Sequence, residues 1–277
     1  MEIVSENKCF DGVQGVYKHK STSCQCDMTF GLFLPADCRN DATPVIWFLS
    51  GLTCTHENAM LKSMAQYFAN RHRVAIVFPD TSPRGDSVPD DEAYDLGKGA
   101  GFYVDATEEP WAKNYGMRKY IESELPKLIF SSFPLSPELQ GICGHSMGGH
   151  GALTVAMSNP DRFRSVSAFA PIANPTKSDW GRKQFLAYLG EDESVWERFD
   201  STILMKETGF PGPILIDQGT KDPFYDLLMP GSLMQAMIDV RQNGSFHLRE
   251  GYDHSYFFIM SFIESHIKFH RQAAGKS

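Results

Sequence analysis

The stretch that decides the fold reads Gly144-His145-Ser146-Met147-Gly148-Gly149. It follows an apolar run at residues 139–143 and leads into the helix-prone residues 152–157, so we expect a strand, a sharp turn and a helix in that order. A Gly-x-Ser-x-Gly turn in this setting is typical of a nucleophile elbow, which exposes a serine hydroxyl to a base. We expect the outer glycines to give an incoming carbonyl its clearance. The stretch predicts Ser146 as a nucleophile, against the alternative of a plain strand-to-helix turn.

The chain around this stretch alternates between strand and helix patterns. Apolar runs at 45–49 and 74–78 are typical of strands covered on both faces, and a helical pattern at 60–68 lies between them. Such a strand-helix-strand unit implies a right-handed crossover and a parallel sheet. Residues 26–34 alternate with the period of a strand, which predicts an antiparallel edge near the N-terminus. Further strands are predicted at 165–170, 213–217 and 245–249, and further helices at 115–130, 233–240 and 256–269.

These elements predict one doubly wound α/β domain over residues 1–277, with a mostly parallel sheet and helices on both faces. Two excursions interrupt it. Residues 81–111 are rich in Pro, Gly and Asp, and residues 174–209 carry aromatic side chains that we interpret as a helical insertion. Long excursions usually cover a site, so we expect both to lie over the active site. The glycines at 97–101 do not predict a nucleotide site, because no strand immediately precedes them.

The partners of the serine are expected after late strands, because reactive groups in a doubly wound sheet lie beyond the carboxyl ends of the strands. Asp222 follows the predicted strand at 213–217, and His254 follows the one at 245–249. The order Ser, Asp, His along the chain is that of α/β-hydrolases. We therefore predict that His254 accepts the Ser146 proton while Asp222 fixes the tautomer of His254.

Four other residues compete for these roles. Asp217 and Asp253 lie near the predicted acid, but we expect a strand end to hold Asp217 and the backbone to direct Asp253 away. His145 and His150 lie near the serine in sequence. A residue adjacent in sequence usually cannot satisfy the geometry of the serine hydroxyl, so we interpret both histidines as packing or lid contacts.

Two backbone N–H groups are predicted to hold the negative oxygen of a tetrahedral intermediate. The Met147 N–H begins the helix after the elbow, and the Leu52 N–H lies on the loop after the strand at 45–49. Cys54 lies two residues beyond Leu52 and therefore close to the acyl site. It is either a nucleophile or a bystander, and we favour the bystander because the predicted base already serves Ser146.

Composition argues against several classes of partner. The 277 residues carry a net charge of −8 with no long Lys/Arg block, which argues against nucleic acid or an anionic membrane as the main partner. No apolar run approaches the ~18 residues of a membrane span, and the N-terminus lacks the pattern of a signal peptide. We therefore expect a cytoplasmic protein.

The six cysteines indicate reduced thiols. None belongs to a Cys-x-x-Cys pair, and Cys143 lies inside the strand that leads to the elbow. The sequence Cys24-Gln25-Cys26 suggests a metal, but its thiols would point to opposite faces of a strand and no second ligand pair follows. We expect no metal.

Five motifs lie in order within about residues 15–269: Ser50-Gly51-Leu52-Thr53-Cys54, Gly99-Ala100-Gly101-Phe102-Tyr103, Gly144-His145-Ser146-Met147-Gly148-Gly149, Asp217-Gln218-Gly219 and Gly251-Tyr252-Asp253-His254-Ser255-Tyr256. Together they resemble the motifs of one known family, the S-formylglutathione hydrolases or esterase D family. The resemblance implies an α/β-hydrolase fold, cytoplasmic detoxification of formaldehyde and hydrolysis of S-formylglutathione to glutathione and formate. It also implies short-acyl esterase activity, no cofactor and a homodimer.

The same resemblance implies roles for single residues. It implies that Ser146, Asp222 and His254 form the catalytic triad, with Leu52 and Met147 at the oxyanion positions. The chain departs from the family in Pro223, where we expect a polar residue; a proline stiffens the loop without removing the carboxylate beside it.

Three alternatives to a formylglutathione hydrolase stay open. They are a short-chain carboxylesterase with another physiological substrate, an acyltransferase that excludes water, and a non-catalytic binding protein with a hydrolase fold. The complete set of Ser, Asp and His argues against the last of these.

Overall fold

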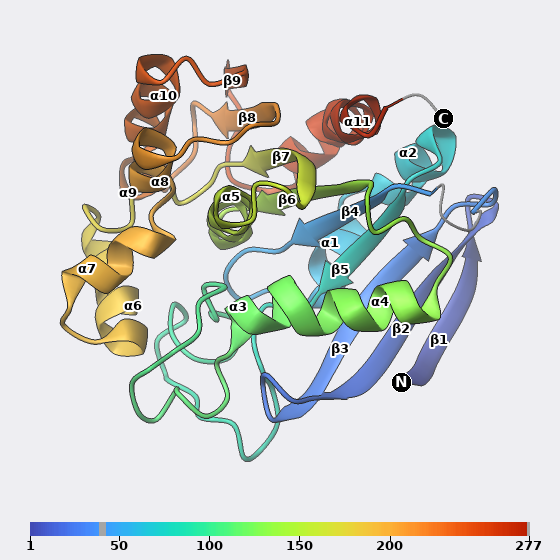
Figure 1. The fold of residues 1–277 in the computed structure, drawn as a ribbon, viewed down its shortest axis with the longest axis horizontal. Coiled ribbons are helices and arrows are strands. Elements are labelled where there is room, and N and C mark those ends of the chain that lie inside the picture. Colours follow the sequence, from blue (N-terminus) through green and yellow to red (C-terminus); the bar gives the residue numbers. More distant parts are fainter. Residues whose placement is uncertain (39–42, 276–277) are drawn as a thin grey trace.

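The computed structural model describes residues 1–38 and 43–275. Its centre is a nine-stranded sheet in the order β1-β2-β3-β5-β4-β6-β7-β8-β9 (Figure 1). The first three strands are antiparallel, as is the pairing of β3 with β5, and the pairings from β5 to β9 are parallel. The strands are β1 (Glu2–Cys9), β2 (Gly12–Ser21), β3 (Cys26–Leu34), β4 (Val45–Leu49), β5 (Ala75–Pro79), β6 (Gln140–His145), β7 (Phe163–Phe169), β8 (Ile214–Gly219) and β9 (Gly244–Arg249).

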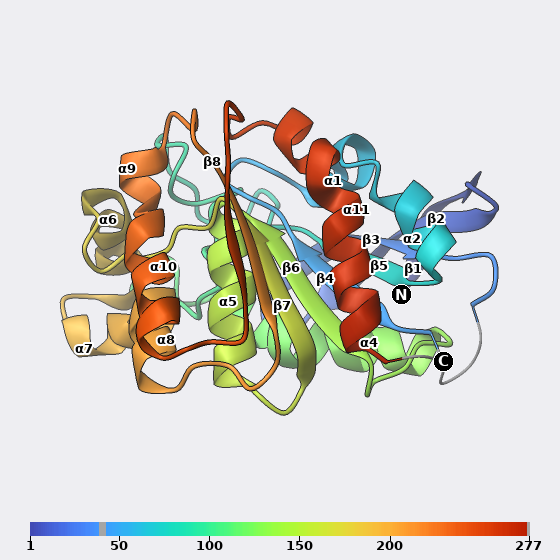
Figure 2. The same cartoon turned by 90° about the horizontal axis from the view of Figure 1, so that it is seen from above.

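Helices cover both faces of the sheet. In Figure 2, α1, α2 and α11 lie on one face, while α4 and α5 lie on the other. A π-helical turn at Tyr120–Glu124 joins α3 to α4, and a 3-10 turn at Glu197–Phe199 follows α7. The helices are α1 (His56–Lys62), α2 (Ala65–His72), α3 (Met117–Lys119), α4 (Leu125–Ser132), α5 (Met147–Ser158), α6 (Asp179–Leu189), α7 (Glu193–Trp196), α8 (Ser201–Glu207), α9 (Tyr225–Leu228), α10 (Pro230–Asp239) and α11 (Tyr256–Ala273).

Burial along the strands explains this arrangement. Every residue of β4, β5, β6 and β8 is buried, as the continuous apolar runs predict for strands with helices on both faces. The outer strands β1 and β9 are largely exposed. The prediction of a doubly wound, mostly parallel sheet with an antiparallel N-terminal edge is confirmed, and this is the architecture of the α/β-hydrolase fold.

The helical pattern at residues 60–68 does not form one helix. The helix α1 ends at Lys62 with Ser63 as its C-cap, and Met64 adopts a left-handed conformation with φ of 59° before α2 begins. The Ser63 hydroxyl accepts a hydrogen bond from the Ala65 N–H at 3.2 Å, which stabilises the start of the second helix. The apolar spacing predicted which residues face the core. It did not predict that the helix is interrupted at Ser63 and Met64, where this local hydrogen bond forms.

The predicted helix at 115–130 is also divided. The π-helical turn lies between α3 and α4, just before Pro126. A proline within a helix removes one N–H and clashes with the carbonyl four residues earlier, and a wider turn accommodates it.

The two excursions differ in structure. Residues 81–111, which are all described, form no helix or strand beyond a single bridge between Asp105 and Gly116. Residues 174–209 contain α6, α7 and α8. Within the described part of the chain, none of the helices combines the length and apolar character needed to cross a membrane.

The parallel strands bring the predicted site residues to one edge of the sheet. Parallel strands present their carboxyl ends on the same side, so the loops that follow them meet there. Leu52 follows β4, Ser146 follows β6, Asp222 follows β8 and His254 follows β9.

Candidate active site

Ser146 is held in a strained turn between β6 and α5. Its φ of 58° and ψ of −120° lie in a region that residues with a Cβ rarely occupy. The turn is fixed by three backbone hydrogen bonds. The Ser146 N–H donates to the Phe169 carbonyl at 2.9 Å, and the Ser146 carbonyl accepts from the N–H groups of His150 at 3.0 Å and Ile172 at 3.3 Å. Backbone strain of this kind persists only where the surroundings impose it, as at an elbow that must present its side chain.

The elbow glycines serve the packing of the backbone. A Cβ on Gly144 would lie 2.0 Å from the carbonyl oxygen of Gly148, and one on Gly148 would lie 2.0 Å from that of Leu49. We expected these glycines to clear a path for an incoming carbonyl. The structure adds a second role, because these glycines let the first turn of α5 pack directly against β6 and β4, where no side chain would fit.

Asp222 and His254 form a hydrogen-bonded pair next to this elbow. His254 Nδ1 lies 2.6 Å from Asp222 Oδ2. The carboxylate is buried and accepts two further hydrogen bonds, from Gln218 Nε2 to Oδ2 at 3.1 Å and from the Phe224 N–H to Oδ1 at 2.8 Å. Pro223, which follows Asp222 directly, leaves this carboxylate in place. The acid is therefore fixed in orientation before any substrate binds.

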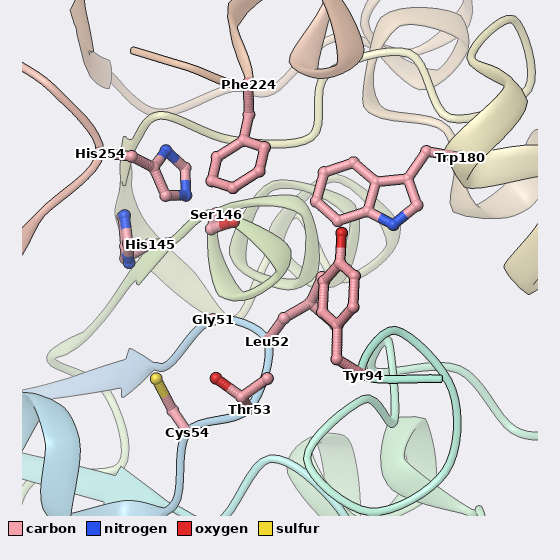
Figure 3. Close-up of a pocket in the computed structure, with 10 residues that line it drawn as sticks. All are labelled: Gly51, Leu52, Thr53, Cys54, Tyr94, His145, Ser146, Trp180, Phe224 and His254. Carbon is pink, nitrogen blue, oxygen red and sulfur yellow. The ribbon is translucent and has the colours of Figure 1, made fainter. Parts of the chain in front are cut away.

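The serine hydroxyl and the histidine are neighbours in the same cavity. Figure 3 shows the ring of His254 beside Ser146. Ser146 Oγ makes no hydrogen bond to any residue that the structure describes. Hydrogen bonds between a nucleophile and its base are often long in the free protein and tighten when substrate binds.

The rival acids have other partners. Asp217 is buried within β8 and accepts hydrogen bonds from Arg249 at 2.9 Å and 3.0 Å, with His247 Nδ1 at 2.8 Å. Burial alone would raise the pKa of Asp217, but the hydrogen bonds and charges of His266, Arg249 and His247 lower it to about 2. Asp253 is exposed and accepts from Ser255, so neither acid contacts His254 in the way that Asp222 does.

The rival histidines also lie in separate surroundings. His150 is buried between Phe102 and Phe185, with ring centroids at 6.2 Å and 6.1 Å, and burial together with the charge of Arg118 lowers its pKa to about 3. It does not line the cavity, as expected of a packing residue. His145 differs, because it lines the cavity and touches the ring of His254.

The backbone N–H groups of Leu52 and Met147 are the predicted oxyanion donors. Neither N–H donates a hydrogen bond within residues 1–38 and 43–275. The loop that carries Leu52 passes close to the nucleophile, since a Cβ on Gly51 would lie 3.1 Å from Ser146 Cβ. The Thr53 N–H binds Gly99 at 2.9 Å and fixes the turn. The described part of the chain therefore leaves both donors unused, on the loop that passes Ser146 and on the residue that follows it.

The cavity in front of the elbow is small and mostly apolar. Its volume is about 260 Å³. Figure 3 shows His145 and His254 on one side of it, with Trp180 and Tyr94 on the other. The residues that line it are Gly51, Leu52, Thr53, Cys54, Tyr94, His145, Ser146, Trp180, Phe224 and His254.

Sequence reasoning missed the aromatic wall of this cavity. Tyr94 comes from the excursion at 81–111 and Trp180 from α6 in the second excursion. Asp95 joins them, because its Oδ2 accepts a hydrogen bond from Trp180 Nε1 at 3.0 Å while its Oδ1 binds Lys183 Nζ at 2.6 Å. Single aromatic residues in irregular segments carry no periodic signal, so only the existence of the excursions could have pointed to them.

No metal centre accompanies these residues in the described part of the chain. Among its residues, no group of three or more His, Cys, Asp or Glu side chains has a geometry suited to a metal ion. Cys24 is buried, with its sulfur 3.8 Å from Met117 Sδ.

Comparison with known proteins gives one consistent result. The Esterase family model matches residues 21–269. The S-formylglutathione hydrolase of Paracoccus denitrificans (strain Pd 1222) is 60% identical over 274 residues, which cover 99% of this chain and 98% of that protein. The S-formylglutathione hydrolase of Mus musculus is 48% identical over 274 residues, which cover 98% of this chain and 97% of that protein.

A solved structure agrees with these relatives. An S-formylglutathione hydrolase from Agrobacterium tumefaciens matches this fold with a TM-score of 0.97 at 44% sequence identity, covering 99% of this chain and 100% of that chain. The family that the motifs suggested is therefore found by sequence and by structure over nearly the whole chain. This chain belongs to the S-formylglutathione hydrolase family of esterases.

Proposed function

We infer that this protein is a serine hydrolase that cleaves the thioester S-formylglutathione to glutathione and formate, with short-acyl ester hydrolysis as a side activity. The observation that carries the chemistry is the 2.6 Å hydrogen bond between His254 and Asp222 beside the strained elbow of Ser146. The names of relatives at 48–60% identity support the substrate.

In the first half of the proposed reaction, Ser146 Oγ attacks the formyl carbon while His254 takes the hydroxyl proton. The carbonyl oxygen becomes negative and accepts hydrogen bonds from the N–H groups of Leu52 and Met147. Asp222 stabilises the imidazolium that forms. The carbon–sulfur bond then breaks, and the His254 proton goes to the sulfur, which releases glutathione and leaves a formyl ester on the serine.

In the second half, water takes the place of the thiol. His254 removes a proton from the water as it attacks the formyl ester, and the same two N–H groups hold the new oxyanion. Collapse of this intermediate returns the proton to Ser146 Oγ and releases formate. A formyl group needs little space, which agrees with a cavity of about 260 Å³.

The substrate is tested by comparing specificity constants for S-formylglutathione and for simple short-chain esters. We expect kcat/KM for the thioester to be larger, because a thiolate leaves more readily than an alkoxide and the glutathione part adds binding contacts. A constant no greater than those of the esters would favour a general carboxylesterase. An acyltransferase would transfer the formyl group to an added alcohol in preference to water, which product analysis would reveal.

We also propose that residues 1–277 form a single domain, that the protein is a homodimer and that it acts in the cytoplasm. Glutathione keeps that compartment reducing, which suits a glutathione thioester and unpaired cysteines. Strongly exposed apolar side chains such as Leu61 and Phe257 support a surface for self-association. Sedimentation equilibrium should give twice the 31.1 kDa mass of one chain.

Cys54 is expected to act as a bystander whose modification blocks the site. Its sulfur lies 4.0 Å from Tyr256 Oη, and burial raises the pKa of the thiol above its ordinary value. Only the thiolate reacts with alkylating reagents, so inactivation by iodoacetamide should be slow near pH 7 and accelerate about tenfold per pH unit toward pH 9. Cys54→Ala should keep most activity and resist the reagent. The measurement is residual esterase activity against time at several pH values.

Cys143 provides the control. It is fully buried in β6, and burial raises the pKa of its thiol to about 12, so it should not react in the folded protein. Cys143→Ala should therefore be inactivated like the wild type. If Cys54→Ala is as inactive as Ser146→Ala, then the thiol takes part in the chemistry and the bystander assignment is wrong.

A further inference from the structure

His145 is a buried polar side chain in the wall of the active-site cavity. It is the last residue of β6, directly before Ser146, and only 6% of it is exposed. Both of its ring nitrogens are buried without a hydrogen-bond partner in the part of the chain that the structure describes. Burying an unpaired polar group costs free energy, and an apolar side chain would fill the same space without that cost. The imidazole therefore needs an explanation other than packing.

The ring of His145 lies against the proposed general base. The centroids of His145 and His254 are 4.5 Å apart, with the rings tilted by 44°. On another side, His254 makes an edge contact with Phe224 at 5.1 Å and 77°. Together with the hydrogen bond to Asp222, these contacts hold the His254 imidazole at three places.

The polar edge of His145 also approaches the main chain of His254. Burial lowers the pKa of His145 well below its ordinary value, and the neighbouring His254 side chain lowers it further. An attraction between the ring and the backbone of His254 opposes this lowering only in part. That contact is looser than an ordinary hydrogen bond, because neither ring nitrogen has a hydrogen-bond partner among the described residues. Figure 3 agrees, since a nitrogen of His145 lies toward the point where His254 joins its loop.

A neutral His145 suits a supporting role. It adds no second positive charge when His254 becomes an imidazolium, and it cannot compete for Asp222, which is occupied by His254 and Gln218. Its ring lies against a neighbour that is cationic during the reaction. The loop at 250–255 that carries His254 contains no helix or strand of its own and gains a fixed point from this contact.

We propose that His145 is a positioning residue for the reaction, which holds both the ring and the main chain of His254 so that the imidazole faces Ser146. This proposal rests on the proposed role of His254 as the base. His145 itself does not touch the reacting atoms in this scheme. Its effect on the reaction passes through His254 alone.

Replacement of His145 by phenylalanine, asparagine and glutamine separates positioning from packing. Phenylalanine keeps an aromatic ring but has no N–H group, whereas the amides of asparagine and glutamine place an N–H near the Nδ1 and Nε2 positions. Misplacement of a catalytic group lowers turnover, so we expect His145→Phe to lower kcat about tenfold with KM within about twofold of wild type. The better of the two amide variants should recover to within about threefold of the wild-type kcat. Steady-state kinetics and thermal unfolding of each variant provide the measurements.

His150 is the matched control, since it is a second fully buried histidine whose nitrogens are unpartnered among the described residues, and it does not touch His254. The same substitutions at His150 should change thermal stability but leave kcat within about twofold. If His145→Phe keeps the wild-type kcat, then the ring nitrogens contribute nothing to positioning, His145 only fills space and the proposal is wrong. An equal loss of kcat in the His150 series would overturn it as well.

A simple ester such as p-nitrophenyl acetate should be assayed beside S-formylglutathione. A wild-type protein that hydrolyses the ester but not the thioester would contradict the proposed substrate, and the order of the His145 variants on the ester would still test the positioning role. His145→Phe should lower kcat on both substrates by the same factor, because His254 serves both reactions. A loss confined to the thioester would mean that His145 contacts the glutathione part instead.

Discussion

Replacing Ser146 by alanine is expected to lower kcat by about 1,000-fold or more for both thioester and ester substrates. The reason is that Ser146 combines a strained backbone with two neighbouring features. These are the hydrogen-bonded pair of His254 and Asp222 and two backbone N–H groups that are unused among the described residues. Removal of the Ser146 hydroxyl oxygen leaves the cavity and the donors intact but removes the atom that we propose forms the acyl intermediate. The residual rate should come from binding and the oxyanion donors alone.

The fold of this variant should be normal, which thermal unfolding can verify. The backbone of Ser146 is fixed by hydrogen bonds of its N–H and C=O groups, and its hydroxyl makes none within the described residues, so the truncation removes no structural contact. A fluorophosphonate reagent should label the wild type at one serine and fail to label Ser146→Ala. Turnover near the wild-type level would show that another group is the nucleophile.

The sequence contained enough information to predict the frame of the site. The elbow at 144–149 has a local signal, because a strand, a turn and a helix in that order leave a readable pattern of apolar and glycine residues. Asp222 and His254 could be predicted because the parallel topology determines where reactive groups lie, beyond the strands at 214–219 and 244–249. Their hydrogen bond at 2.6 Å is a tertiary fact that the order of residues only suggested.

The parts that could not be predicted depend on contacts between distant segments. Trp180 and Tyr94 meet at the cavity because Asp95 ties α6 to the irregular excursion, and no local periodicity encodes such a contact. The packing role of the elbow glycines likewise depends on a distant segment, because Gly148 in α5 approaches the backbone of Leu49 in β4. His145 could be dismissed as packing from its place next to Ser146, and only its contact with His254 gave it another possible role.

Replacing Asp222 by asparagine is expected to lower kcat by about 1,000-fold or more, although the two side chains have the same shape. The Phe224 N–H donates to Asp222 Oδ1 at 2.8 Å, so the amide oxygen of asparagine would take that position. The amide NH₂ would then occupy the position of Oδ2, facing both His254 Nδ1 and Gln218 Nε2. This NH₂ group would donate a hydrogen bond to His254 Nδ1, so the proton of the neutral histidine would be on Nε2. With Nε2 protonated, His254 cannot accept the proton of Ser146.

KM should change little in Asp222→Asn, because Asp222 does not line the cavity. Asp222→Ala tests the tautomer argument: alanine imposes no proton on Nε2, so its kcat should be at least as high as that of the asparagine variant. A much more active asparagine variant would contradict the argument.

Asp217→Asn is the matched control, because Asp217 is a second buried acid and lies in β8, the strand that leads to Asp222. The Asp217 carboxylate binds Arg249 and His247, and its pKa is lowered to about 2. The charge of Asp217 therefore stabilises the fold fully above the ordinary aspartate pKa of about 4. This stabilisation is lost only as the pH falls through about 2. At pH 7 this substitution should therefore lower the melting temperature but leave kcat within a few fold. If instead Asp217→Asn abolished turnover in a folded protein and Asp222→Asn did not, Asp217 would be the acid of the reaction, and the hydrogen bond to His254 would have been assigned the wrong role.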